Sequence, residues 1–122
     1  MNSLFLCLGA ISAFAGVSMG AFGAHALKTV LSPDMLEVYK TAVSYQMWHA
    51  LGLVAVAFIP SGSALVHWAG WLMFAGILLF SGSLYLLTIL NLKWLGMITP
   101  IGGVAFLSAW LLIAIFAVKT QS

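Results

Sequence analysis

The chain has 122 residues, of which 64% are hydrophobic and only 5% are charged, with a formal net charge of +2. Soluble domains carry about 25% charged residues, so this composition excludes an ordinary soluble globular protein. Four basic residues, all of them lysine, are too few to neutralise a nucleic-acid backbone. A single cysteine, Cys7, excludes an internal disulfide and a thiolate metal cage.

Three stretches of the chain lack charged side chains, residues 1–27, 41–92 and 94–118. Each is longer than the roughly 20 apolar residues that cross a bilayer core. The middle stretch is long enough to cross twice, and Pro-Ser-Gly-Ser at 60–63 interrupts it with residues that end helices and form turns. Because backbone groups in hydrocarbon must bond internally, the sequence predicts four helices, at about 3–26, 42–59, 64–90 and 95–118.

The lengths of the connections indicate how these helices are arranged. Those at 60–63 and 91–94 are short, which favours antiparallel neighbours. We therefore expect an all-α fold, an integral membrane antiparallel four-helix bundle, which forms a single domain over residues 1–122. The lipid bilayer is then its principal partner, and nucleic acid is not a partner.

The remaining connection, at 27–41, contains most of the charge of the protein. Ser32 is a favourable N-cap, Pro33 suits a first helical turn and Asp34 complements the helix dipole. A short helix at the membrane interface is therefore predicted at about 33–41. Four of the six charged residues lie in this connection and are expected to be solvated: Lys28, Asp34, Glu37 and Lys40.

Small residues recur at helical spacing and allow the close backbone contact by which helices associate in lipid. The first predicted helix has one every four residues, and the third and fourth helices carry glycines. These positions favour packing within the bundle, and the sequence leaves open whether some serve a homo-oligomeric contact instead. The candidate packing residues are Ser12, Gly16, Gly20, Ala24, Gly76, Gly102 and Gly103.

Polar residues inside the predicted helices are the candidate functional residues, because a polar group in hydrocarbon is costly unless it is paired. They lie in the half of the bundle nearest the 27–41 connection, whereas His67 lies near the opposite rim. Two interpretations remain open, a hydrogen-bonded cluster that sets helix register and a binding site for a small ligand, a lipid or an ion. The candidate binding residues are His25, Tyr45, Gln46, His49, Ser81, Tyr85 and Thr99.

The same residues argue against catalysis. The sequence contains no nucleophile paired with a base and no carboxylate pair, and its three histidines fall on three different helices. We expect neither an enzyme nor a resident metal or cofactor. Two alternatives to a binding protein are a haem or quinone carrier that uses His25 and His49, and a small oligomeric transporter or channel. Proton-coupled transport generally uses a carboxylate within the membrane, and the sequence places none there.

Four blocks of sequence, one in each predicted helix, resemble the signature blocks of the YgdD/YwdK-type family of small membrane proteins, which is catalogued as a domain of unknown function. The resemblance follows the whole chain in order. It implies a four-span, multi-pass protein of the bacterial cytoplasmic (inner) membrane and brings no established reaction or ligand with it. The blocks are Gly20–Leu27, Tyr45–Leu51, Phe80–Tyr85 and Thr99–Gly103.

The best functional expectation is a non-catalytic membrane protein that binds a small ligand, a lipid or an ion near one membrane face. The orientation is open. Lys28, Lys40 and Lys93 would place their loops in the cytoplasm by the positive-inside rule, whereas the resemblance implies cytoplasmic termini. This chain also lacks the basic residues that such relatives carry between the second and third helices.

Overall fold

A computed structural model describes residues 1–60 and 62–121, so Ser61 of the predicted break lies outside the described residues. The described chain is helical and contains no strand, which confirms the all-α expectation. It is built from α1 (Ser3–Ser18), the π-helix η1 (Met19–Gly23), α2 (Ala24–Leu27), α3 (Pro33–Ala57), α4 (Ala64–Gly76), the π-helix η2 (Ile77–Ser81), α5 (Gly82–Ile89), the 3-10 helix η3 (Lys93–Met97) and α6 (Thr99–Gln121).

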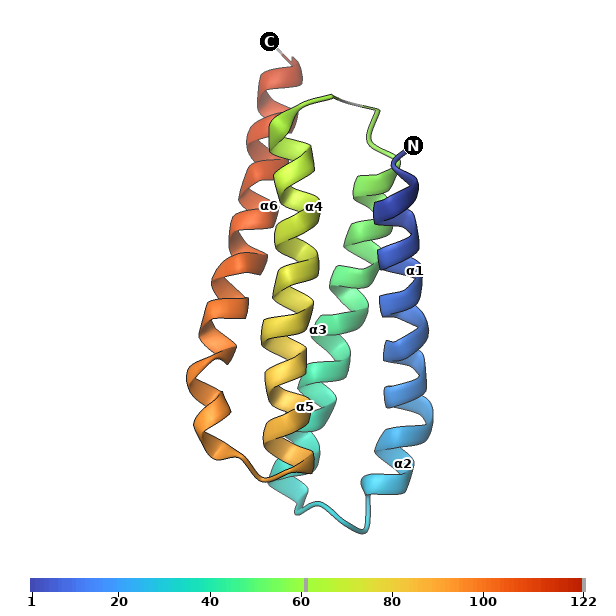
Figure 1. The fold of residues 1–122 in the computed structure, drawn as a ribbon, viewed down its shortest axis with the longest axis vertical. Helices are drawn as coiled ribbons and strands as arrows, with labels where there is room; N and C mark the ends of the chain where they lie inside the picture. The colour runs from blue at the N-terminus through green and yellow to red at the C-terminus, as the bar shows by residue number, and fades with distance from the viewer. Residues whose placement is uncertain (61, 122) are drawn as a thin grey trace.

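These elements form four long rods, because η1 continues α1 into α2 and η2 continues α4 into α5. Consecutive rods run in opposite directions along the long axis of the molecule (Figure 1). The start of α1 and the end of α6 lie at one end, together with the α3–α4 connection. The connections 28–32 and 90–92 lie at the other end, which we call the loop end.

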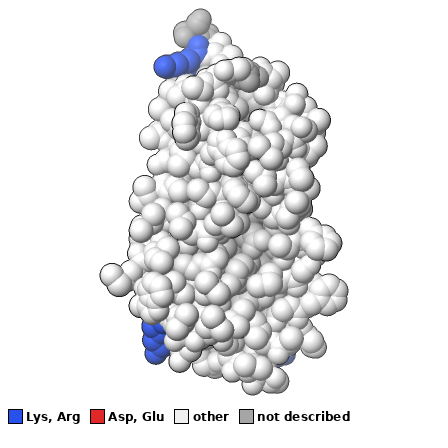
Figure 2. Space-filling view, in the orientation of Figure 1, with Lys and Arg blue, Asp and Glu red and all other residues white. Residues whose placement is uncertain are grey.

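Three of the rods are long and apolar enough to cross a membrane: Ser3–Leu27, Ala64–Ile89 and Lys93–Thr120. The rod α3 is not among them, although it has 25 residues. On the face of the molecule shown in Figure 2, the charged side chains lie at the two ends of the bundle, and the surface between these ends is uncharged. A surface of this kind suits a hydrocarbon environment between two aqueous ends.

The start of α3 follows from its sequence. The hydroxyl of Ser32 accepts a hydrogen bond of 3.2 Å from the backbone N–H of Met35 and caps the helix. The predicted interfacial helix at 33–41 and the predicted span at 42–59 are one continuous helix, since no helix-breaking residue separates them. Glu37 and Lys40 are exposed on the first turns of α3, with Nζ of Lys40 3.7 Å from Oε1 of Glu37. An ion pair in solvent contributes little to stability.

The start of α6 differs from the predicted position near residue 95. Residues Lys93–Met97 form a 3-10 turn, and the α-helix begins at Thr99, with Pro100 in its first turn. Proline lacks an N–H, and the first turn of a helix is where the loss of that donor costs least. Asn91 ends the preceding rod in the left-handed conformation, with φ of 55°.

The apolar core lies in the half of the bundle away from the loop end. It joins α1, α3, α4 and α6, and consists mainly of aliphatic residues with two phenylalanines. Toward the loop end the interior contains polar side chains instead, in the half of the bundle where the sequence predicts them. The buried core cluster is Phe5, Leu53, Val56, Ala57, Val66, Ala69, Met73, Ile77, Phe106 and Ala109.

Candidate functional site

The side-chain amide of Gln46 joins three rods. Its Nε2 donates a hydrogen bond of 2.9 Å to the carbonyl oxygen of Ser12 on α1, and its Oε1 accepts one of 2.5 Å from the hydroxyl of Tyr85 on α5. Gln46 is 5% exposed, so these bonds form out of contact with solvent or lipid. An amide satisfied at both ends in this way fixes the register of α3 against two neighbours.

Two further polar side chains clamp α3 through backbone carbonyls. Ser81 donates a bond of 2.7 Å to the carbonyl oxygen of Ala42, and Tyr39 donates one of 2.7 Å to that of Met19, the first residue of η1. Among the described residues, every buried side-chain nitrogen or oxygen has a hydrogen-bond partner. The polar interior is therefore internally satisfied, as in a hydrogen-bonded cluster that holds helices together.

The contact of Ser83 with Thr99 joins α5 to α6. The two hydroxyl oxygens lie 2.6 Å apart, and Ser83 also donates to the carbonyl oxygen of Phe80. The hydroxyl of Thr99 lies 3.5 Å from the carbonyl oxygen of Leu95, so either hydroxyl can be the donor in the contact with Ser83. Thr99 belongs to the hydrogen-bonded interior in this way, although it does not touch Gln46.

His49 has both ring nitrogens engaged. Its Nδ1 lies 2.7 Å from the carbonyl oxygen of Tyr45, and its Nε2 lies 3.0 Å from the indole nitrogen of Trp110 on α6. A carbonyl oxygen only accepts and an indole N–H only donates, so Nδ1 carries the proton and Nε2 is the acceptor. The geometry therefore assigns a neutral imidazole in a single tautomer, which also stacks on the ring of Phe106 at 3.5 Å and 10°.

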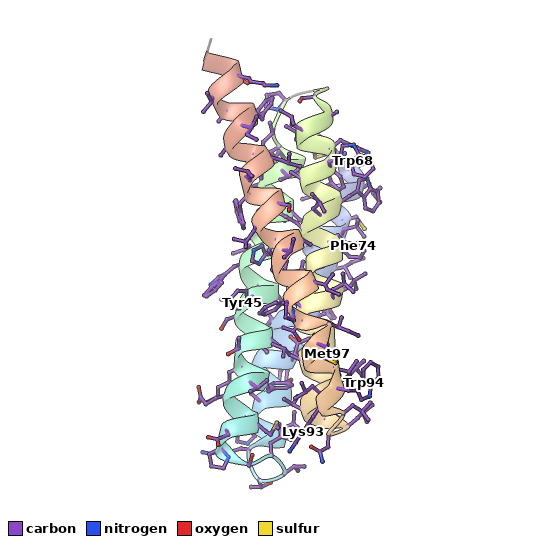
Figure 3. All side chains as sticks on the ribbon, turned by 90° about the vertical axis from the view of Figure 1, so that its left-hand side faces the viewer. Tyr45, Trp68, Phe74, Lys93, Trp94 and Met97 are labelled. Atoms are coloured by element: carbon purple, nitrogen blue, oxygen red, sulfur yellow. The ribbon has the colours of Figure 1, made fainter. Side chains whose placement is uncertain are left out.

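A hollow of about 450 Å³ lies beside this imidazole, between α3 and α6, and we call it the α3–α6 groove. From Pro100 to Trp110 it follows α6 for roughly 15 Å, at 1.5 Å per residue. Figure 3 shows Tyr45 on α3 to one side of α6, at about mid-height of the bundle. The lining is aromatic and aliphatic and contains no charged residue: Tyr45, His49, Phe80, Pro100, Gly103, Val104, Phe106, Leu107 and Trp110.

Two features keep the groove open and partly polar. A Cβ atom placed on Gly103 would meet only the ring of Phe80, at 4.0 Å, so there is open space at this point of α6. The hydroxyl of Tyr45 has no hydrogen-bond partner among the described residues. Tyr45 is half-buried, and its ring stacks on Phe80 with centroids 4.4 Å apart.

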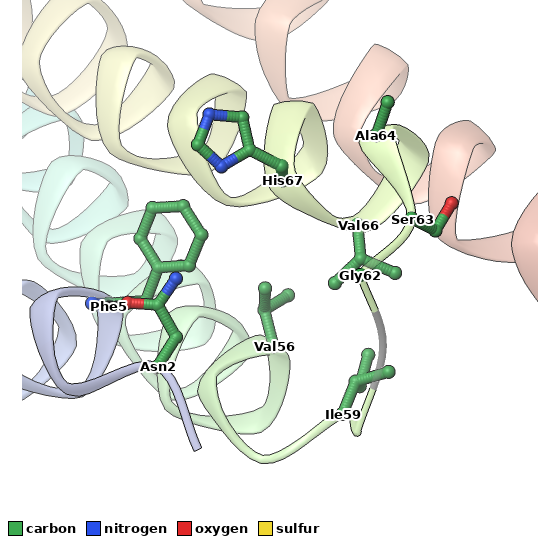
Figure 4. Close-up of a pocket in the computed structure, with 9 residues that line it drawn as sticks. All are labelled: Asn2, Phe5, Val56, Ile59, Gly62, Ser63, Ala64, Val66 and His67. Atoms are coloured by element: carbon green, nitrogen blue, oxygen red, sulfur yellow. Dashed lines mark hydrogen bonds between the residues drawn. The ribbon is translucent and has the colours of Figure 1, made fainter.

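A second hollow, of about 380 Å³, lies at the end opposite the loop end (Figure 4). Its floor contains Phe5, and its polar rim contains Asn2, Ser63 and His67. Two of these side chains cap helices, because Asn2 accepts from the N–H of Phe5 and Ser63 from that of Leu65. None of the predicted site residues lines this hollow. The hollow lies where the start of α1, the end of α3 and the start of α4 meet, so we interpret it as a gap between helix ends.

The structure brings six of the seven predicted binding residues into the loop-end half of the interior or onto the groove. Gln46 and Tyr85 bond directly, and Tyr45 and His49 line the groove. His25 is the exception, since it is exposed on α2 and does not share a site with His49. In the described residues, no cluster of three or more His, Cys, Asp or Glu side chains has the arrangement to hold a metal ion.

Sequence reasoning missed the two residues of α6 that hold His49, Phe106 and Trp110. The signal was available for Trp110. Tryptophan in membrane proteins gathers near the interfaces, and Trp110 falls well inside the helix predicted at 95–118. A tryptophan at that depth has an indole N–H that needs an acceptor, which here is the imidazole of His49.

The predicted packing residues of the first helix lie mostly against α3. A Cβ atom on Gly16 would lie 2.5 Å from the sulfur of Met47, and one on Gly20 would lie 2.9 Å from Val43. Ser12 is buried, and Ala24 is half-buried. Gly9, which was not predicted, makes the closest approach of α1 to the backbone of α3, because a Cβ there would lie 2.9 Å from the carbonyl oxygen of Ala50.

The glycines of the other two rods differ among themselves. A Cβ on Gly76 would clash with the ring of Phe106, and a Cβ on Gly102 would clash with backbone atoms of Phe80. Gly103, by contrast, borders the groove. Gly70, another position that was not predicted, leaves room for the ring of Phe5.

Comparison with known proteins identifies one family. Residues 19–103 match the model of the family described as "Protein of unknown function (DUF423)". The chain is 53% identical over 119 residues to the UPF0382 membrane protein YwdK of Bacillus subtilis, covering 95% of this chain and 97% of that protein. It is 47% identical over 117 residues to a UPF0382 membrane protein of Staphylococcus saprophyticus, covering 95% and 98% respectively. No solved structure matches the chain significantly.

Proposed function

The chain belongs to the DUF423 family of membrane proteins of unknown function, and from that premise we propose that it is a multi-pass protein of the bacterial cytoplasmic membrane. In this proposal it crosses the bilayer four times and binds a lipid-soluble small molecule in the α3–α6 groove without catalysis. The resemblance to YgdD/YwdK-type proteins drawn from the four sequence blocks is confirmed by the family match.

The crossing by α3 is supported by where its polar side chains lie. Gln46 and His49 lower the apolar character of this helix, and both are 5% exposed. Their polar atoms are satisfied by neighbouring rods, so α3 can lie in hydrocarbon without presenting them to lipid. Four antiparallel rods of similar length then cross together, with the charged connection before α3 at one surface (Figure 1).

The α3–α6 groove is the single observation that carries the binding proposal. Small-molecule sites are concave, mostly apolar hollows of roughly 300–1,000 Å³ with a few polar groups, and the groove has about 450 Å³ with an imidazole and a phenol in its lining. The hydrogen-bonded interior around Gln46 is packed and satisfied, so it supports a structural role. Among the candidate ligands, a lipid-soluble molecule therefore fits better than an ion.

The test uses two glycines that accept a larger side chain equally well. Gly103→Leu places an isobutyl group in the α3–α6 groove, whereas Gly82→Leu places one in a different hollow on α5, and a Cβ meets nothing within 4 Å at Gly82. Lipid-soluble molecules that copurify with each protein from its own membranes are quantified by mass spectrometry. We expect Gly103→Leu to lose a molecule that the wild type and Gly82→Leu retain. Identical inventories from all three proteins would overturn the proposal.

A further inference from the structure

We propose that the ligand of the α3–α6 groove is an uncharged, lipid-soluble molecule with a hydroxyl on an aromatic ring, and that this hydroxyl replaces the indole N–H of Trp110 on Nε2 of His49. The inference rests on the proposed function, because it names the ligand class of the same groove.

The groove selects against charge. None of the residues that line it is charged, and two of the lysines lie at the loop end instead, Lys28 in the connection before α3 and Lys93 at the start of η3. A charged group inside hydrocarbon is costly unless an opposite charge or water accompanies it. Phospholipid headgroups and carboxylates therefore do not fit the part of the groove next to His49.

The polar atoms of the groove select for a donor. Nδ1 of His49 is committed to the carbonyl oxygen of Tyr45, so Nε2 is the atom that a ligand can use, and it accepts. A hydroxyl can donate to Nε2, whereas an ether or a ketone cannot. The unpaired hydroxyl of Tyr45 can then donate to the ligand oxygen, so both polar groups of the groove are satisfied.

The two partners in the existing bond differ in how firmly they are held. The imidazole of His49 is 5% exposed and lies on Phe106, so it stays in place. Trp110 is 45% exposed at the side of the bundle. Its indole can move toward lipid without opening the core, which frees Nε2 for the ligand. Trp110 therefore occupies the acceptor when the groove is empty and protects a buried polar atom from being left unpaired.

The rings of the groove select for an aromatic ligand. The rings of Tyr45, Phe80 and Phe106 line the groove, and the centroids of Tyr45 and Phe80 lie 4.4 Å apart. Aromatic pairs contribute beyond the area that they bury. Beside Gly103 there is no side chain to occupy the open space, so a flat ring can enter there from the lipid.

The experiment compares 4-nonylphenol with 4-nonylanisole, which differ by a methyl group that removes the donor. Binding to the purified protein in phosphatidylcholine nanodiscs is measured by equilibrium dialysis against empty nanodiscs. In the wild type, where the phenol must displace Trp110, we expect it to bind roughly threefold more tightly than the anisole, and in Trp110→Phe up to about tenfold more tightly, the range expected of one net hydrogen bond. Nitrogen-15 NMR of labelled histidine should show a shift of His49 Nε2 with the phenol.

Two variants test the role of each partner. His49→Phe keeps a stacking ring and removes the acceptor, so the preference for the phenol should disappear. Trp110→Phe removes the competing N–H, so the ratio of phenol binding to anisole binding should increase. His67→Phe, at the opposite end of the bundle, is the matched control and should bind both compounds as the wild type does.

The outcomes separate this inference from the proposed function. If both compounds bind equally to the wild type and both are lost in Gly103→Leu, the groove binds ligands but the hydroxyl inference is wrong. If neither compound binds saturably and Gly103→Leu has no effect, both the inference and binding of aromatic ligands in the groove are wrong. If the preference persists in His49→Phe, Nε2 is not the acceptor and the inference is overturned.

Discussion

The hydroxyl of Tyr85 donates to Oε1 of Gln46 across the α3–α5 interface, while Nε2 of the same amide donates to the carbonyl oxygen of Ser12 on α1. One side chain thus connects three rods at the same level of the bundle. In lipid, water does not compete for these groups, so such bonds set which residues of neighbouring helices face each other.

Gln46→Leu should destabilise the protein by about 1–3 kcal/mol, because it leaves the hydroxyl of the half-buried Tyr85 and the carbonyl oxygen of Ser12 without their partner. A double-mutant cycle with Tyr85→Phe isolates the bond itself, and we expect a coupling free energy of about 0.6 kcal/mol and no more than about 1.7 kcal/mol. Reversible unfolding in mixed detergent measures each variant. Thr120→Ala, at the exposed end of α6, is the control, and strictly additive effects of the two changes would contradict the prediction.

His49 should show a single neutral tautomer at pH 7. Its Nδ1 faces a carbonyl oxygen and its Nε2 faces an N–H, so nitrogen-15 NMR should report a protonated Nδ1 and an unprotonated Nε2. Trp110→Phe should leave Nδ1 unchanged and shift only Nε2, because the donor to that atom is lost. A mixture of tautomers in the wild type would show that the bond to Trp110 does not form. His67, which is exposed, provides the internal reference for an unconstrained imidazole.

Much of this architecture could be predicted because hydrocarbon imposes it on a single chain. Charge-free stretches of sufficient length must be helical, and the start of α3 follows from the capping sequence Ser32-Pro33-Asp34. Counting depth along each predicted helix was enough to place Gln46 and Tyr85 in the same half of the bundle, which is where the structure joins them. Depth is a one-dimensional property that sequence carries directly.

The direction in which a side chain points could not be predicted in the same way. The π-helix at Met19–Gly23 has a wider turn than an α-helix, which changes the direction of the residues that follow it, and His25 comes out on the exposed surface. The pairing of His49 with Trp110 likewise depends on how α3 and α6 are rotated about their axes. Without that rotation, the sequence shows two compatible residues but not their contact.

Two adjacent glycines of α6 test how closely its backbone approaches η2. A Cβ on Gly102 would lie 2.8 Å from Cα of Phe80, whereas one on Gly103 would lie 4.0 Å from its ring. Gly102→Ala must push two backbones apart and should destabilise the protein by about 1–3 kcal/mol, the cost of overpacking. Gly103→Ala should be neutral or stabilising by up to about 1 kcal/mol, since alanine favours helix. Thermal unfolding of the two variants in one detergent checks this, and equal effects would contradict the approach of α6 to Phe80.

Whether α3 spans the bilayer determines on which side of the membrane three of the lysines lie. Lys28 precedes α3, Lys93 follows α5 and Lys119 lies near the end of α6. If α3 crosses, Lys28 and Lys93 lie on one side of the membrane and Lys119 on the other. If α3 lies at the surface instead, Lys28 and Lys93 lie on opposite sides. Single Lys→Cys variants at these positions, in a Cys7→Ala background, convert this difference into a labelling pattern.

Intact cells and permeabilised cells are each treated with a membrane-impermeant maleimide, and the labelled fraction of the protein is quantified from its mass shift. We expect the cysteines at positions 28 and 93 to react under the same condition and that at position 119 under the other, because the polar side of α3 is covered by its neighbours and the helix can remain in hydrocarbon. The Cys7→Ala parent, which has no thiol, is the control. Different behaviour at positions 28 and 93 would show that α3 does not cross, and the side on which position 119 reacts identifies the orientation that the lysine distribution and the family resemblance leave in conflict.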